Sequence, residues 1–149
     1  MRNSIETGTK MNLARVMVGG ILAGVVVSVI TGVANTLLLQ NDFLSWAASM
    51  EGHLHPPSQG AQVSLWTVMA LLDGMVSVWI YAGMRPRYGA GAKTALLSGI
   101  LVWIVARFCV ALDMIGLGVF PLKLLIGQSA LGLIAILSGA LAGAWLYKE

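Results

Sequence analysis

The sequence predicts an all-α integral membrane protein, folded as a bundle of four transmembrane helices. Of its 149 residues, 58% are hydrophobic and only 10% are charged, and the mean hydropathy is +0.85. Soluble domains carry roughly 25% charged residues, so this chain has too few to cover a soluble core. Four apolar stretches approach or exceed the roughly 20 residues that a span requires. They cover residues 16–39, 63–84, 94–112 and 122–147, and we expect them to form one membrane domain over residues 1–149.

The first apolar stretch follows a short polar leader that contains Arg2, Lys10 and Arg15. A basic leader before an apolar run also occurs in signal peptides, but their apolar regions are only about 7–15 residues long. Residues 16–39 would extend about 36 Å as a helix, which exceeds a hydrocarbon core of roughly 30 Å. We therefore expect an uncleaved first span.

Small residues recur along one side of the first and fourth spans. Such ridges let two helix backbones approach closely, as in the GxxxG motif. They predict packing within the bundle, and they also offer a surface for a second copy or another membrane protein. The ridge residues are Gly20, Gly24, Ser28 and Gly32 in the first span, and Gly132, Ala135, Gly139 and Gly143 in the fourth.

The basic residues predict the topology. Seven of the nine Lys and Arg residues lie in the leader, in the loop 85–93 or at Lys148. We expect the protein to lie in the inner membrane of the cell. Because cytoplasmic segments are enriched in Lys and Arg, we expect both of its termini to be cytoplasmic. The connection 40–62 is then extracytoplasmic. Within it, residues 43–50 resemble a short interfacial helix, with Asp42 as the N-cap and Trp46 at headgroup level.

Two charged residues fall inside the predicted spans. Asp73 precedes Arg85 by twelve residues, or about 18 Å along a helix. Arg107 follows Lys93 by fourteen residues, or about 21 Å. The second and third spans are antiparallel neighbours, so these depths bring the two side chains together, and we predict an ion pair. An unpaired charge at mid-membrane costs about 2.5–3.5 kcal/mol on insertion scales.

The ion pair has two interpretations. In the first, it is a structural link that fixes the second span against the third. In the second, Asp73 changes its charge during a transport cycle, and polar residues extend a path through the membrane. Ser77 and Tyr81 share the helix face of Asp73, and Asn35 lies toward the far end of the first span. We favour the structural interpretation and keep the transport site as the alternative.

Two polar clusters lie outside the spans. Arg85, Arg87 and Lys93 precede the third span and form a candidate contact for an anionic lipid headgroup, although we favour ordinary membrane anchoring as their role. Glu51, His53 and His55 are candidate metal ligands in the extracytoplasmic connection. The chain has no further histidine to complete such a site, so we expect a polar loop there.

No motif predicts catalysis or a cofactor. The single cysteine, Cys109, lies within a span, without metal-ligand spacing. The net charge of +3 comes from residues at span ends, which speaks against nucleic-acid binding. The expected partner is the lipid bilayer, with a homodimer or another membrane protein on the glycine ridges. We expect a non-catalytic membrane subunit or scaffold. The alternative is a dimeric transporter, for a small solute or coupled to protons, that uses the Asp/Arg pair.

Overall fold

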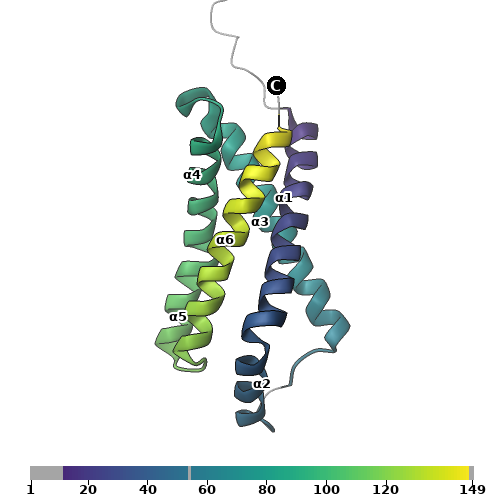
Figure 1. The fold of residues 1–149 in the computed structure, drawn as a ribbon, viewed down its shortest axis with the longest axis vertical. Coiled ribbons are helices and arrows are strands. Elements are labelled where there is room, and N and C mark those ends of the chain that lie inside the picture. The colour runs from purple at the N-terminus through teal and green to yellow at the C-terminus, as the bar shows by residue number, and fades with distance from the viewer. Residues whose placement is uncertain (1–11, 54, 148–149) are drawn as a thin grey trace, which may run out of the picture.

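The computed structural model of the chain describes residues 12–53 and 55–147, and every regular element in these residues is helical (Figure 1). The expectations for Arg2, Lys10 and Lys148 lie outside the described residues. In chain order the elements are α1 (Leu13–Ala34), the π-helical turn η1 (Asn35–Leu39), α2 (Gln40–Ser49), α3 (Gln59–Tyr88), α4 (Ala92–Trp103), the π-helical turn η2 (Ile104–Phe108), α5 (Cys109–Leu117) and α6 (Leu122–Leu146).

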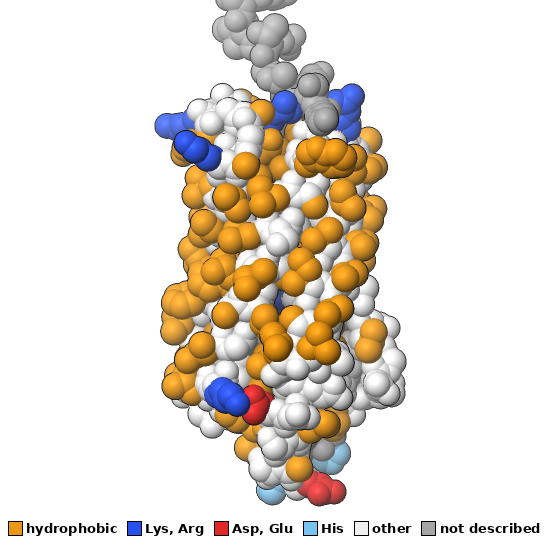
Figure 2. All heavy atoms as spheres, in the orientation of Figure 1, with side chains coloured by type: hydrophobic (Ala, Val, Ile, Leu, Met, Phe, Trp, Pro, Cys, Tyr) orange, Lys and Arg blue, Asp and Glu red, His pale blue; other side chains and the backbone are white. Residues whose placement is uncertain are grey.

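Four helical segments are long and apolar enough to cross a membrane. Two of them are continuous through a π-helical turn, so that α1 runs into α2, and α4 runs into α5. Large apolar side chains are exposed over the middle of the molecule, and Figure 2 shows them as a broad band between two more polar ends. An exposed apolar surface of this extent is typical of contact with lipid rather than water. The segments are Leu13–Ser49, Gln59–Tyr88, Ala92–Leu117 and Leu122–Leu146.

The connections between helices are shorter than the sequence suggested. The segment 85–93 is mostly helical, because α3 continues through Tyr88 with Pro86 in its last turn. The reversal itself is made by Gly89 and Gly91, whose φ angles of 83° and 149° favour glycine. Polar residues at a span end can continue a helix, so the end of an apolar run does not mark the end of the helix.

The segment 40–62 also differs from the expectation. A helix does form near residues 43–50, as α2, but it continues directly from η1 and has no side-chain cap. Asp42 is therefore not an N-cap; its carboxylate pairs instead with Lys123 at the start of α6. Trp46 is buried, and its indole nitrogen hydrogen-bonds to Val119 in the connection between α5 and α6.

The small-residue ridges pack inside the bundle. A Cβ atom added at Gly24 would lie 2.6 Å from the Leu71 Cα atom of α3, and one at Gly139 would lie 2.7 Å from the Ala23 carbonyl oxygen of α1. Such distances leave no room for a larger residue. Gly32 differs, because nothing lies within 4 Å of the corresponding position. On the α1 ridge, Gly20 and Gly24 therefore pack against α3, whereas the position of Gly32 is open.

The N-terminal part of α3, residues 59–69, diverges from the bundle. Residues 59–69 include no buried side chain, and the first buried residue of the helix is Ala70. Figure 1 shows this part of α3 diverging from α1 toward the end that carries α2. The bundle is therefore tightly packed near the basic turn and more open at the opposite end.

Candidate functional site

Asp73 and Arg107 are in contact. The Arg107 Nη2 atom donates a hydrogen bond to Asp73 Oδ2 over 2.6 Å, which is a short, charge-assisted contact. The Asp73 side chain is 10% exposed and the Arg107 side chain 26% exposed. The two charges thus neutralise each other between α3 and η2.

Arg107 lies on η2, and its stem rests on α6. A Cβ atom added at Gly132 would lie 3.2 Å from Arg107 Cγ, so the absence of a side chain at Gly132 makes room for the arginine. The Arg107 Nε atom is buried and has no hydrogen-bond partner among the described residues. The guanidinium therefore keeps one donor that the Asp73 contact does not use. π-Helical turns such as η2 occur frequently at functional sites.

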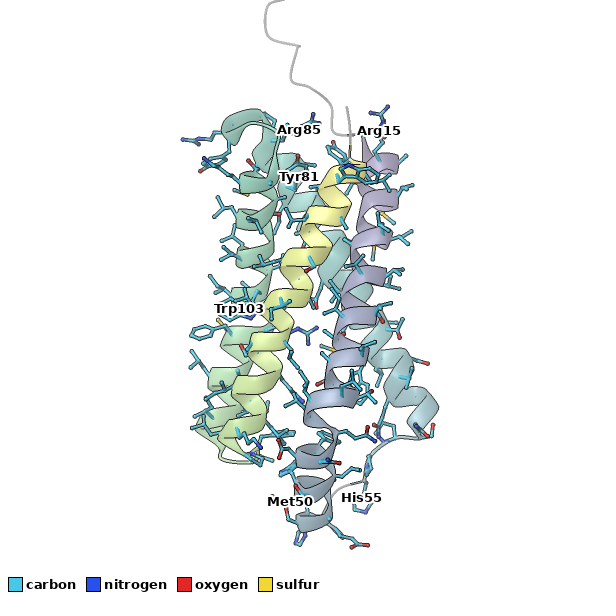
Figure 3. All side chains as sticks on the ribbon, in the orientation of Figure 1. Arg15, Met50, His55, Tyr81, Arg85 and Trp103 are labelled. Carbon is cyan, nitrogen blue, oxygen red and sulfur yellow. The ribbon has the colours of Figure 1, made fainter. Side chains whose placement is uncertain are left out.

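Trp103 ties the same segment to α6. Its Nε1 atom donates a hydrogen bond to the Ser129 carbonyl oxygen over 2.9 Å, and its ring contacts that of Phe108 at a centroid distance of 5.3 Å. Figure 3 places Trp103 at mid-height in the bundle, beside α6. Sequence reasoning did not identify this residue, because a tryptophan in an apolar span reads as one more lipid-facing side chain.

Ser77 is buried beside Asp73, but it does not bind the carboxylate. Its hydroxyl donates to the Asp73 backbone carbonyl over 2.7 Å, which is a bond within the helix. Gly74 packs against Gly24 of α1 so closely that a Cβ atom could not be added. Helix packing therefore fixes the backbone around Asp73, and the Asp73 carboxylate pairs with Arg107.

Tyr81 lies farther toward the basic end. Its hydroxyl accepts a hydrogen bond from the Gly91 N–H over 3.3 Å, and its ring meets that of Tyr147 edge-on at 6.1 Å. Tyr81 thus fastens the turn between α3 and α4. It does not extend a polar path from Asp73 through a direct contact.

Asn35 lies in the opposite direction. It begins η1, eleven residues beyond the Gly24 that packs next to Asp73, which is about 16 Å along a helix. Within the described part of the chain, its side chain makes no hydrogen bond across helices. The structure thus brings together Asp73 and Arg107, with Ser77 adjacent, and separates Tyr81 and Asn35 from them on either side.

Four of the described basic residues, Arg15, Arg85, Arg87 and Lys93, lie near one end of the bundle, where Figure 3 labels Arg15 and Arg85. The Arg85 guanidinium lies over the Tyr147 ring, 5.7 Å from its centroid, in a cation–π arrangement. Arg87 and Lys93 are exposed. This end has the charge to meet anionic headgroups.

The histidine segment lies at the other end. Glu51, His53 and His55 are all exposed, and Figure 3 labels His55 beyond the end of the bundle. Within residues 12–53 and 55–147, no three His, Cys, Asp or Glu side chains are grouped as a metal site would require. These three residues therefore do not form a metal site in the described part of the chain.

Comparisons with protein-family models, with curated proteins and with solved structures found no match for this chain. The residues and their arrangement are therefore the whole basis for a functional proposal.

Proposed function

We propose that the chain is a four-span protein of the bacterial inner membrane with a non-catalytic role, as a membrane subunit or scaffold. Both termini are cytoplasmic in this proposal, because more basic residues lie at the end of the bundle where α1 begins and α6 ends than at the other end. Four apolar helices of sufficient length support the membrane location. One observation carries the non-catalytic role. Among the described residues, the only charged pair at mid-depth, Asp73 and Arg107, joins α3 to η2.

The glycine ridges support the same role. Neighbouring helices of the same chain occupy the space beside Gly24, Gly139 and Gly143. A second copy therefore has little of the ridges left to pack against, and the buried small residues serve to make a compact support. An ion pair within such a support fixes register more than it adds net stability, because pairing mainly offsets the cost of burying two charges.

A transporter is the second candidate, and one observation favours it. About a quarter of the Arg107 side chain is exposed, and its Nε atom has no partner among the described residues. A charged pair that is not fully sealed could exchange a proton or a solute. In this candidate Asp73 is the working carboxylate, with Ser77, Tyr81 and Asn35 along the path.

One panel of variants separates the two candidates. We expect Asp73→Asn and Arg107→Gln each to reduce membrane insertion and thermal stability in detergent, by about 2–3 kcal/mol, because each leaves an unpaired charge. The double variant should recover most of that loss, since it leaves none. Single variants that fold normally, with no rescue in the double variant, would contradict a structural pair.

The transport candidate makes a different prediction for the same panel. Reconstituted in vesicles under a pH gradient, the wild-type protein would move protons or solute, Asp73→Glu would retain part of that flux, and Asp73→Asn would abolish it while remaining folded. No flux through the wild-type protein under these conditions would remove the transporter and leave the scaffold.

A further inference from the structure

A pocket lies at the end of the bundle opposite the basic turn, where α2 packs beside the start of α6. Its volume is about 230 Å³. Typical small-molecule sites measure roughly 300–1,000 Å³, so this pocket has room for a compact polar group rather than a whole metabolite. Its lining residues are Asp42, Ser45, Trp46, Ser49, Pro121, Lys123 and Leu124.

The pocket carries one positive and one negative charge. Lys123 Nζ lies 2.8 Å from Asp42 Oδ2 and 2.9 Å from Asp42 Oδ1. The Lys123 side chain is 77% exposed and that of Asp42 33% exposed, so both remain accessible. An ammonium has three donors and a carboxylate has about four acceptor positions, which leaves capacity for a ligand on each. Figure 2 shows an acidic and a basic side chain in contact near this end of the apolar band.

The wall of the pocket is held in place by Trp46. Its Nε1 atom donates to the Val119 carbonyl oxygen over 3.1 Å, and its ring stacks on Phe120 at 4.2 Å. Ser45 and Ser49 donate their hydroxyl protons to backbone carbonyls of α2. Their oxygens are therefore left as acceptors, and the pocket offers several acceptors beside a single ammonium.

We propose that this pocket binds the headgroup of a zwitterionic phospholipid, with the phosphate on Lys123 and the ammonium of phosphatidylethanolamine on Asp42 and the serine oxygens. A pair with no net charge favours a ligand that carries both signs over an anionic lipid. Leu44 and Leu122, each next in sequence to a lining residue, are exposed apolar side chains that can meet the acyl chains. The inference rests on the proposed membrane location, and it is independent of what Asp73 and Arg107 do.

The test uses the whole protein in detergent micelles, so that it does not depend on transport or on insertion. The probes are short-chain phosphatidylethanolamine, phosphatidylglycerol with the same chains, and free O-phosphoethanolamine. Binding is measured by native mass spectrometry and by the shift in melting temperature. We expect phosphatidylethanolamine to bind at least about threefold more tightly than phosphatidylglycerol, the size of effect that one exposed ion pair supplies.

Variants then locate the preference. Asp42→Asn should abolish the preference, because the ammonium loses its carboxylate. Lys123→Gln should weaken the binding of both lipids, because both lose the contact to their phosphate, whereas Lys123→Arg should keep that binding because the charge is retained. Asp113→Asn, which neutralises an exposed carboxylate outside the pocket lining, is the matched control and should leave the preference unchanged. Equal binding of the two lipids, a preference that survives Asp42→Asn, or an unchanged affinity of Lys123→Gln would overturn the proposal. Free O-phosphoethanolamine binding as tightly as the lipid would overturn the lipid as the ligand and assign the pocket to a soluble phosphoamine.

Discussion

The Arg107 side chain reaches Asp73 because its surroundings fix the base from which it extends. Gly132 leaves room for its stem, and Trp103, one turn earlier, hydrogen-bonds to α6. The contact with Asp73 could be predicted from the sequence because a helix rises by a constant distance per residue, so that depth follows from counting. The two supports could not be predicted, since they depend on which face of each helix meets α6.

Trp103 provides the prediction at this scale. Replacing Trp103 by Phe keeps an aromatic ring but removes the donor to Ser129 O, and should lower the free energy of unfolding by about 0.5–1.5 kcal/mol. Thermal unfolding in detergent measures this loss. Trp79→Phe is the control, because Trp79 is exposed and its indole donates no hydrogen bond within the described residues. An equal effect of both substitutions would mean that ring size, rather than the hydrogen bond, matters at Trp103.

At the scale of elements, apolar runs predict spans more reliably than they predict helix ends. Each of the four expected spans corresponds to a helix long and apolar enough to cross a membrane. The helices nevertheless extend into polar sequence, because polar residues can continue a helix beyond the end of an apolar run. The π-helical turns η1 and η2 left no visible mark in the sequence, because one extra residue in a turn hardly changes an apolar pattern.

The ridge of α1 provides the prediction for elements. Gly24→Ala would place a methyl group against the backbone of α3 and should cost about 1–3 kcal/mol of stability, as overpacking does. Gly32→Ala, on the same ridge but with open space around it, should be neutral or stabilise by up to about 1 kcal/mol through helix propensity. Urea or thermal unfolding of both variants measures the difference. Equal losses would show that α3 also packs on the second half of the ridge.

At the scale of the whole molecule, the two ends of the bundle differ in charge. Arg87 lies beside the α3–α4 turn at one end, and Glu51 follows α2 at the other. The tally of basic residues predicts the orientation, because the rule depends on composition near the span ends and not on packing. How far the helices spread apart at each end depends on side-chain contacts, and could not be read from composition.

Cysteine labelling tests the orientation in intact cells. With Cys109→Ala as the background, we expect Glu51→Cys to react with a membrane-impermeant maleimide added outside, because the positive-inside rule places that end outside. Arg87→Cys should react only after the membrane is permeabilised. The reverse pattern would contradict the orientation while leaving the bundle itself unaffected.

The divergence of the outer part of α3 has a consequence for the surrounding lipid. Residues 59–69 stand apart from the other helices, while the same helix is packed tightly near the basic turn. In the proposed orientation, the protein therefore occupies a larger cross-sectional area in the outer leaflet than in the inner one. A wedge of this kind displaces unequal numbers of lipids from the two monolayers, and it fits best where the bilayer bends toward the cytoplasm.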